Sequence, residues 1–396
     1  MKLNMLTGLS ETIPGSLGSV SIIGLTSNSA EVKPGYLFFG LPGANVDGAR
    51  FVSEAAERGA CAAIVSLNSH VAAATIPVFR AESPRRVLAH AAAMFYGKQP
   101  QTIAAVTGTA GKTSVANFLR QIWAIEGKAA ASLGTTGVIA PGRDDYGNLT
   151  TPDPIFLHAL LAELADDGVT HVSMEASSHG LDQSRLDGVR PAVAGFTNLG
   201  RDHLDYHTDM EDYLSAKLRL FQDLLQEGAP AVVFSDDVYS QKVIDAAQSA
   251  GREVLTVGRS GEYISLKKVE HQQHSQIVEL VFGNTHYRIE FPLAGDFQIA
   301  NGLVAAGMAI ATGSLPESAF QALEQLKGAS GRLELVGKTK TGASTYVDYA
   351  HKPEALENVL TSLRPFTSGK LVLVFGCGGD RDRGKRAIMG EIAERL

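Results

Sequence analysis

Short apolar segments alternate with amphipathic ones along the first hundred residues, a pattern typical of a small α/β unit. The segments predicted to contain strands are 19–25, 31–40 and 61–65. Residues 49–59 place apolar and charged side chains at helical spacing. Pro84 follows Ser83 and opens a further predicted helix, because proline is favoured in the first helical turn. Residues 97–100 are expected to form a linker.

The alternation becomes regular after residue 100, where strand and helix candidates follow one another. The predicted strands are 103–107, 171–175, 194–198 and 231–235. The predicted helices are 114–126, 206–225, 238–250 and 297–312. Residues 252–293 carry further strand patterns. This order predicts a mostly parallel sheet covered by helices.

The last part of the chain, from about residue 331, contains two predicted strand–helix pairs. The strands are 345–348 and 370–376, and the helices are 353–363 and 385–396. Two such pairs bury little apolar surface, so we expect the chain to lack the end of this unit. The sequence therefore predicts an α/β protein of three units, with boundaries at 1–98, 99–330 and 331–396.

Composition narrows the class of protein. The chain has 396 residues, of which 44% are hydrophobic and 19% charged, as expected for a globular protein. Its net charge of −7 disfavours a nucleic-acid partner, which would require a basic patch. Cys61 and Cys377 lie far apart and predict neither a disulfide nor a zinc site. The sequence has no signal-peptide pattern and no apolar run of membrane length, so we expect a soluble, cytoplasmic protein. We also expect it to be a monomer.

A glycine-rich loop, Gly108-Thr-Ala-Gly-Lys-Thr113, joins a predicted strand to a predicted helix. Backbone N–H groups at the start of a helix attract phosphate, Lys112 can neutralise its charge, and the Thr113 hydroxyl can ligate Mg²⁺. The complete phosphate-loop pattern has glycine where this chain has Val106. An ordinary strand-to-helix turn is the alternative, and the strand–loop–helix context favours a nucleotide site.

Two polar segments follow later strands of the same unit. Glu175 ends a predicted strand, and a carboxylate there, beside a phosphate loop, is well placed to hold Mg²⁺. A surface glutamate is the alternative. The segment 197–207 collects the further ligand candidates Asp202, His203, Asp205 and His207. Taken alone, this segment could equally be a solvated loop.

Lys217 and the segment 374–386 complete the candidate residues. A single lysine on a helix is ordinarily solvated, so Lys217 by itself predicts no function. The segment 374–386 combines glycines with basic residues before a helix, which suits an anionic group. A glycine turn with a solvated basic face is the alternative.

These motifs, in this order, resemble the Mur ligase family of peptidoglycan synthesis. The segments that carry the resemblance are 107–114, 149–152, 174–185, 196–207, 215–217, 295–301, 331–334, 347–353 and 376–386. The resemblance implies three domains: a UDP-substrate domain at 1–98, a central phosphate-loop ATPase domain with a parallel sheet at 99–330, and an incomplete, Rossmann-like amino-acid domain at 331–396. It also implies an ATP-dependent ligase that adds a diamino acid to UDP-N-acetylmuramoyl-L-alanyl-D-glutamate through an acyl phosphate.

The resemblance further implies roles for individual residues. Catalytic roles fall on Lys112, Glu175, His203 and Lys217. Contacts with ATP fall on Gly108, Thr109, Ala110, Gly111, Lys112, Thr113, Ser114, Asn301, Arg332, Asp348 and His351. The muramoyl-dipeptide would contact Thr150, Thr151, Ser177, Gln183 and Arg185, and the UDP part of that substrate would contact Ser27 and the 43–45 turn. Thr113 and Glu175 would hold one Mg²⁺; His203 and Lys217, which the family carbamylates with CO₂, would hold a second.

The chain departs from the family pattern at two places. Ala110 stands where the family often has asparagine, so one side-chain contact to phosphate is absent, although the backbone cradle should survive. The chain ends at Leu396, before the Asp-Asn-Pro-Arg motif with which the family selects the added amino acid. The form of segment 379–386 resembles members that use meso-diaminopimelate rather than L-lysine, with Arg381 placed to bind a substrate carboxylate.

Two alternatives to this function remain open from the sequence. One is a related ligase, such as one that adds D-Ala-D-Ala or adds glutamate to folate. The other is a non-catalytic nucleotide-binding relative, which the early end of the chain and Ala110 would suit.

Overall fold

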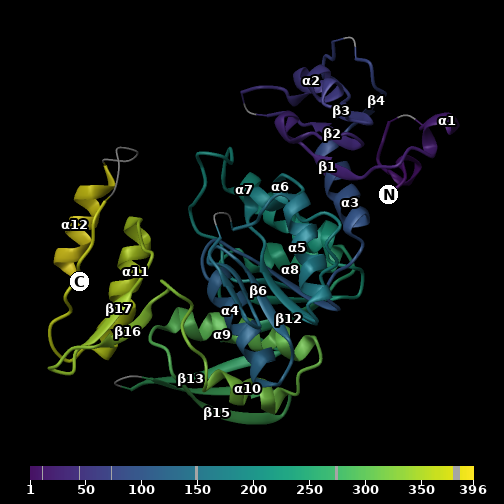
Figure 1. Cartoon of the computed structure of the whole chain (residues 1–396). Coiled ribbons are helices and arrows are strands. Elements are labelled where there is room, and N and C mark those ends of the chain that lie inside the picture. Colours follow the sequence, from purple (N-terminus) through teal and green to yellow (C-terminus); the bar gives the residue numbers. More distant parts are fainter. Residues whose placement is uncertain (11, 44, 73, 148–149, 273–274, 378–383) are drawn as a thin grey trace. The chain divides into compact units, whose positions relative to one another are not determined.

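The chain divides into two units whose segments interleave in the sequence. One comprises Met1–Gln101, Thr151–Val169 and Ser177–Arg190; the other comprises Thr102–Thr150, Thr170–Ala176 and Pro191–Leu396. The computed structural model describes every residue except 11, 44, 73, 148–149, 273–274 and 378–383 (Figure 1). Chain order alone does not reveal this division, because 151–169 and 177–190 return to the first unit.

A parallel sheet in the order β1-β2-β3-β4 organises the first unit. Its strands are β1 (Gly24–Thr26), β2 (Tyr36–Gly40), β3 (Ala62–Ser66) and β4 (Val78–Ala81). Its helices are α1 (Gly15–Gly18), α2 (Val52–Glu57), α3 (Pro84–Tyr96), α5 (Pro154–Asp166) and α6 (Ser178–Asp182), with 3₁₀ turns at Leu3–Met5, Ser29–Glu31 and Gly48–Phe51. The strand predicted over 19–25 is shorter than expected, because its ladder with β2 begins only at Gly24.

Local sequence signals set the ends of α3 and α5. Pro84 is the first residue of α3, and the helix ends at Gly97, whose φ of +72° lies in the left-handed region that glycine tolerates. The Asp153 carboxylate caps α5 by accepting backbone N–H groups of Ile155 and Phe156 at 3.0 and 3.1 Å. Since α5 packs against α3, the segment after residue 150 joins the first unit.

Eleven strands form the sheet of the second unit, in the order β15-β14-β13-β12-β11-β10-β5-β9-β6-β7-β8. They are β5 (Thr102–Thr107), β6 (Ala130–Gly134), β7 (Gly137–Ala140), β8 (Arg143–Asp145), β9 (His171–Glu175), β10 (Val193–Phe196), β11 (Pro230–Phe234), β12 (Glu253–Gly258), β13 (Ile264–His271), β14 (Gln276–Phe282) and β15 (Thr285–Phe291). The strands between β6 and β13 pair in parallel, and antiparallel strands extend both edges. The predicted parallel sheet is confirmed.

Helices of the second unit build its core against this sheet. They are α4 (Lys112–Ile125), α7 (Met210–Arg219), α8 (Ser240–Ser249), α9 (Asp296–Ala311) and α10 (Pro316–Leu323), and a π-helical turn at Leu220–Leu224 continues α7. Phe118 and Trp123 of α4 lie fully buried with Met308 of α9 and Phe320 of α10. Burying each such side chain contributes about 2 kcal/mol relative to its exposed state. The core therefore fixes α4, which follows the glycine-rich loop, firmly on the sheet.

The segment from residue 331 contains β16 (Glu334–Lys338), β17 (Ser344–Val347), α11 (Pro353–Leu363), a 3₁₀ turn at Arg364–Phe366 and α12 (Lys385–Arg395). The strands β16 and β17 form a separate antiparallel pair. The prediction of a strand over 370–376 is wrong: a strand requires a hydrogen-bonded neighbour, and none pairs with these residues in the described part of the chain.

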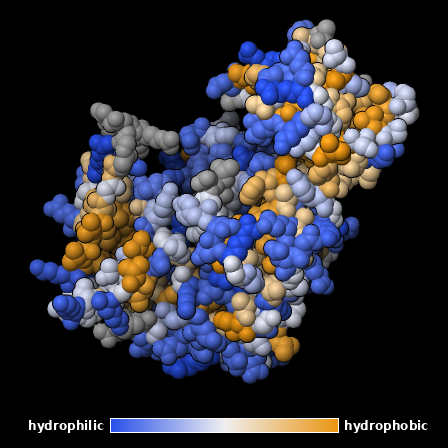
Figure 2. Space-filling model, viewed as in Figure 1, coloured by the Kyte–Doolittle hydropathy of each residue, from blue (hydrophilic) through white to orange (hydrophobic). Residues whose placement is uncertain are grey.

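A small apolar cluster packs α11 against α12. Its buried members are Leu356, Leu360, Met389 and Ile392. Figure 2 shows apolar surface over this part of the chain, and exposed apolar side chains there are Val372, Val374, Phe375 and Ile388. No helix in the described ranges is both long and apolar enough to cross a membrane.

Candidate functional site

Two glycines shape the loop that joins β5 to α4. Gly108 has a φ of +148° and Gly111 a φ of +88°. A side-chain carbon on Gly108 would lie 1.9 Å from Thr197 Oγ1, and one on Gly111 would lie 2.2 Å from Asn301 Oδ1. Both positions therefore require glycine. Because the first N–H groups of α4 have no partner within the helix, the loop offers donors suited to phosphate.

The end of β10 holds this loop in place. Thr109 N donates to Asn198 O at 2.8 Å, and Ala110 N donates to Asn198 Oδ1 at 3.0 Å. Thr197 Oγ1 donates to Ala110 O at 2.6 Å. These contacts arise because β5 and β10 are parallel neighbours, so that their carboxyl ends meet. Ala110 is thus anchored through its backbone, and the Thr113 and Ser114 side chains lie buried in the first turn of α4.

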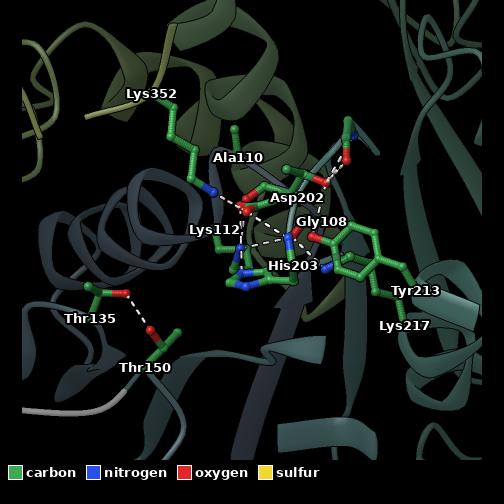
Figure 3. Close-up of polar contacts among 12 residues, drawn as sticks. Gly108, Ala110, Lys112, Thr135, Thr150, Asp202, His203, Tyr213, Lys217 and Lys352 are labelled. Atoms are coloured by element: carbon green, nitrogen blue, oxygen red, sulfur yellow. Dashed lines mark hydrogen bonds and ion pairs between the residues drawn. The ribbon is translucent and has the colours of Figure 1, made fainter. Parts of the chain in front are cut away.

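The side chains of Lys112 and Lys217 converge on the carbonyl oxygen of Gly108 (Figure 3). Each Nζ donates to that oxygen at 2.8 Å, and Lys112 also donates to Thr109 O at 2.9 Å. Lys217 lies on α7 and is only 1% exposed. The general expectation of a solvated helix lysine is therefore wrong at this position, and the fold brings the two lysines together.

Burial lowers the pKa of both lysines. The pKa of Lys217 falls well below its ordinary value because of burial and the neighbouring charge of Lys112, and Asp202 only partly opposes this. Burial also lowers the pKa of Lys112, while the charges of Glu175 and Asp202 act in the opposite direction. Carbamylation requires a neutral amine, so this environment suits the modification implied for Lys217.

Glu175 and Thr113 form a buried pair at the carboxyl end of β9. Glu175 is 2% exposed, and its Oε1 accepts the Thr113 hydroxyl at 3.0 Å and the Thr135 N–H at 2.7 Å. The Thr135 hydroxyl is 2.9 Å from that of Thr150. A side-chain carbon on Gly134 would lie 2.0 Å from Glu175 Oε1, so glycine leaves room for the carboxylate. A carboxylate beside a hydroxyl is the oxygen donor set that Mg²⁺ prefers, and these residues fit the predicted role.

His203 lies beside Asp202 in the loop after β10. Its backbone has a φ of +54°, its N–H donates to Asp202 Oδ1 at 2.8 Å, and its Nε2 is 3.6 Å from Asp202 Oδ2. The same carboxylate forms an ion pair with Lys352 (Figure 3). Burial would raise the pKa of Asp202, but Lys352 and His203 together lower it.

The donor set around His203 alone does not make a metal site. Within the ranges that the structure describes, no three or more His, Cys, Asp or Glu side chains group in a way that could hold a metal. His207 is buried, with its Nδ1 3.3 Å from Asp212 Oδ2. A second cation at His203 would therefore depend on an added carboxylate, which a carbamate on Lys217 would supply.

Four predicted substrate residues form one cluster in the first unit. Thr151 Oγ1 accepts the backbone N–H and the hydroxyl of Ser177 at 3.1 and 3.0 Å. Arg185 donates to Thr151 O at 2.8 Å and, through Nη2, to Gln183 Oε1 at 2.7 Å. Ser27 follows β1 in the same unit, whereas Thr150 belongs to the second unit. Nearly all residues predicted to bind the muramoyl-dipeptide substrate thus share one unit.

The remaining predicted nucleotide residues belong to the second unit. Asn301 of α9 is buried against Gly111. The Arg332 guanidinium lies 5.0 Å from the centre of the Tyr349 ring. Asp348 accepts the Leu333 N–H at 2.7 Å, and burial raises the pKa of its carboxyl group.

His351 and Arg381 complete the predicted residues of this unit. His351 is exposed, with its carbonyl oxygen 2.9 Å from Lys385 Nζ. Arg381 lies outside the described residues, as does residue 44 of the 43–45 turn.

The residues of the site that were not predicted from the sequence include Thr197, Asn198 and Tyr213. Thr197 and Asn198 directly follow β10, and the pairing of that strand with β5 could have pointed to them. Tyr213 lies four residues before Lys217 on α7, and this spacing places both side chains on one helix face. Each of the three contacts the glycine-rich loop.

Models of known families match three parts of the chain. The Mur ligase middle domain matches residues 106–309. The model described as Mur ligase, glutamate ligase domain, matches residues 331–396. The model described as Mur ligase family, catalytic domain, matches residues 21–96.

Individual relatives are similar over almost the whole chain. The UDP-N-acetylmuramoyl-L-alanyl-D-glutamate--2,6-diaminopimelate ligase of Agrobacterium fabrum is 60% identical over 393 residues, covering 99% of this chain and 80% of the relative. A solved structure of a ligase with the same name has a TM-score of 0.81 at 30% identity and covers 99% of this chain and 81% of its own. MurF of Thermotoga maritima, solved with ADP, shares the fold at a TM-score of 0.58 and 22% identity, covering 87% of this chain and 74% of its own.

Proposed function

This chain belongs to the Mur ligase family, and from that premise we propose that it joins meso-diaminopimelate to UDP-N-acetylmuramoyl-L-alanyl-D-glutamate with consumption of ATP. The observation that carries the proposal is the 60% identity over 99% of the chain with a ligase of that name. The geometry around the glycine-rich loop supports it, because the chain places backbone N–H groups that can bind phosphate, two lysines and a buried carboxylate together. We assign the reaction to a monomer in the cytoplasm, within the pathway of peptidoglycan synthesis.

The first step is activation of the substrate carboxylate. The D-glutamate carboxylate attacks the γ-phosphate of ATP, ADP leaves, and an acyl phosphate forms. The N–H groups of residues 111–114, at the start of α4, hold the phosphates, and Lys112 turns from the Gly108 carbonyl to the developing negative charge. Asn301, Arg332, Asp348 and His351 bind the rest of the nucleotide in this proposal.

Two sets of oxygen and nitrogen donors would hold cations at this site. Thr113 and Glu175 would hold one Mg²⁺, and His203 with carbamylated Lys217 would hold a second. Bound Mg²⁺ supplies positive charge next to the transferring phosphoryl group. The buried Glu175 carboxylate supports the first assignment, and the position of His203 and Lys217 around the same Tyr213 ring supports the second.

Carbamylation of Lys217 requires only CO₂ and a neutral amine, and the surroundings of this side chain suit it. The neutral amine adds to CO₂, a C–N bond forms, and one proton leaves to solvent. One N–H remains on the nitrogen and can keep the bond to the Gly108 carbonyl. The product replaces a buried amine with an anion beside Lys112, so the charge that opposed a protonated Lys217 now attracts the modified one.

The second step forms the new peptide bond. The diaminopimelate amine attacks the acyl carbon, a tetrahedral intermediate forms, and phosphate leaves. Thr150, Thr151, Ser177, Gln183 and Arg185 would hold the muramoyl-dipeptide, and Ser27 the UDP part. Arg381 would bind the carboxylate of the incoming amino acid, because a guanidinium binds a carboxylate through two hydrogen bonds. Water must be kept from the acyl phosphate, a task we assign to the 331–396 domain.

A product assay tests this function. The purified chain is incubated with ATP, Mg²⁺, UDP-N-acetylmuramoyl-L-alanyl-D-glutamate and either meso-diaminopimelate or L-lysine, and phosphate and tripeptide are measured separately. We expect tripeptide with meso-diaminopimelate and a far lower rate with L-lysine. Lys112→Ala serves as the inactive control.

Each other outcome has a defined meaning. Tripeptide with L-lysine alone would refute the amino-acid assignment. Phosphate without tripeptide would show carboxylate activation without ligation. Neither phosphate nor tripeptide would favour a nucleotide-binding relative without ligase activity, and product from folate and glutamate would favour the folate-type ligase.

A further inference from the structure

Tyr213 lies at the centre of the site, although none of the proposed steps uses it. It projects from α7, is 1% exposed, and its hydroxyl is 3.2 Å from Thr109 Oγ1 of the glycine-rich loop. Its ring lies under Lys217, whose Nζ is 4.3 Å from the ring centre (Figure 3). The ring of His203 is 6.0 Å away, centre to centre. One side chain therefore touches the loop and both residues assigned to the second cation.

The direction of the hydrogen bond follows from the partners of Thr109. Its Oγ1 accepts the Gly200 N–H at 2.9 Å and lies 3.2 Å from Gly200 O. A threonine hydroxyl has one hydrogen; when Gly200 O accepts it, the Tyr213 hydroxyl donates to Thr109. The bonds thus join three segments: α7, the glycine-rich loop, and the loop after β10 that carries His203.

The ring contact adds a second constraint. Tyr213 and Lys217 are four residues apart on α7 and therefore lie on one face of the helix. Packed on the ring, the Lys217 side chain is directed to the Gly108 carbonyl. The hydroxyl of Tyr213 meets the next residue of the same loop. The tyrosine thus fixes the loop at two consecutive residues, once directly and once through Lys217.

We infer that Tyr213 is a positioning residue: its hydroxyl holds Thr109 and its ring holds Lys217, so that the phosphate loop is preformed for nucleotide. This inference rests on the proposed function, since it concerns how that site is organised. It assigns the hydroxyl a role in nucleotide affinity, whereas a tyrosine that only fills the core would need its ring alone.

Tyr213→Phe tests the inference because it removes the hydroxyl and keeps the ring. Isothermal titration calorimetry with ADP and Mg²⁺ should show a Kd raised about 3- to 10-fold, the range expected for losing one net hydrogen bond. Tyr263→Phe is the matched control, because Tyr263 is a partly buried tyrosine directly before β13 of the same sheet, packed on Phe282. Its Kd should stay at the wild-type value.

A double-mutant cycle shows whether the effect passes through Thr109. Thr109→Val keeps the shape of the side chain and should raise the Kd for ADP by a similar factor or more. In the Thr109→Val background, Tyr213→Phe should change the Kd less than about 2-fold, because its partner is already gone. Thr109→Val also probes the bond independently if Tyr213→Phe folds poorly.

Two results would overturn the inference. One is an ADP affinity of Tyr213→Phe equal to that of the wild type in a folded protein. The other is full additivity of the two substitutions. Both readouts measure ADP binding rather than ligation, so a failure to form tripeptide, which bears on the proposed function, is recorded separately from a failure of this inference.

Discussion

At the residue scale, Lys217 shows how burial changes the protonation of a lysine side chain. Its amine lies within a hydrogen bond of the Gly108 carbonyl, on the ring of Tyr213, and its pKa is lowered by burial and by Lys112. Removing a buried amine that only packs would reduce stability. Removing one that carries an essential carboxylate should instead abolish activity in a protein that still folds.

We therefore expect Lys217→Ala to lower the ligation rate about 100-fold or more, as is typical when a group that stabilises the transition state is lost. Added formate or acetate should restore part of the rate, because a free carboxylate can occupy the space of the carbamate. Lys242→Ala is the control, since Lys242 is half exposed on α8 and ion-paired with Glu211. An unchanged ligation rate in Lys217→Ala would contradict the carbamate proposal.

His158 provides a pH-dependent test of packing in the first unit. Burial lowers its pKa to about 4, while its Nε2 lies 3.1 Å from Asp187 O. An unfolded histidine has a pKa of about 6.5, so between pH 6.5 and 4 the unfolded chain binds a proton that the folded chain excludes. The free energy of unfolding should therefore decrease as the pH falls through this window.

His158→Gln removes the titrating group and keeps an N–H donor for Asp187 O. From pH 7 to pH 5 the wild type should lose about 2 kcal/mol more stability than this variant, a value that follows from the shift in pKa. Denaturant unfolding at several pH values measures the difference. Exposed His286→Gln is the control. Parallel pH profiles for the wild type and His158→Gln would contradict the assignment.

At the element scale, the loop between β5 and α4 depends on backbone conformations that only glycine adopts easily. In Gly108→Ala the new carbon would lie 1.9 Å from Thr197 Oγ1, at a φ of +148°. Strain of about 1–3 kcal/mol would move the loop away from β10, so the affinity for ADP should fall about tenfold or more. Calorimetric titration with ADP and Mg²⁺ measures this change.

Gly127→Ala is the matched control for this element. Gly127 also has a positive φ, of +80°, but an added carbon there would meet no atom within 4 Å. This variant should lose about 1 kcal/mol of stability and keep its affinity for ADP. Equal losses of ADP affinity in both variants would show that backbone strain in general, rather than the shape of the loop, controls binding.

At the scale of the whole molecule, the residues assigned to the two substrates separate by unit. The first unit contains Ser27 and the cluster around Thr151, and the second contains the glycine-rich loop and the other nucleotide residues. Each unit has its own apolar core. Ligands should therefore stabilise the two units selectively.

Differential scanning calorimetry should show two unfolding transitions. ADP with Mg²⁺ at about 100 times its Kd should stabilise the second unit by about 2.7 kcal/mol, and UDP-N-acetylmuramoyl-L-alanyl-D-glutamate should stabilise the first by a similar amount. We expect each ligand to raise mainly one transition temperature. A single transition that both ligands raise equally would contradict independent units.

Several features of the chain follow from the sequence because they depend on local chemistry. The strand 171–175, the helix 353–363 and the glycine-rich loop are set by apolar periodicity, proline and glycine, so they appear where they were predicted. The strand predicted over 370–376 failed because a strand also needs a neighbour, which apolar pattern cannot supply. The domain boundaries at 98 and 330 stay predictions.

The sequence by itself determined the α/β class, the family and the place of the glycine-rich loop, since these depend on patterns within short segments. Only the tertiary structure decided the rest. This includes the burial of Lys217, the hydrogen bonds of two lysines to the Gly108 carbonyl, the bond of Asn198 to the loop, and the position of Tyr213. The physical reason is that strand order sets which loop ends meet. Parallel pairing of β5 with β9 and β10 brings together loops whose contacting residues lie 62 to 109 positions apart, and that proximity changes their charge and contacts.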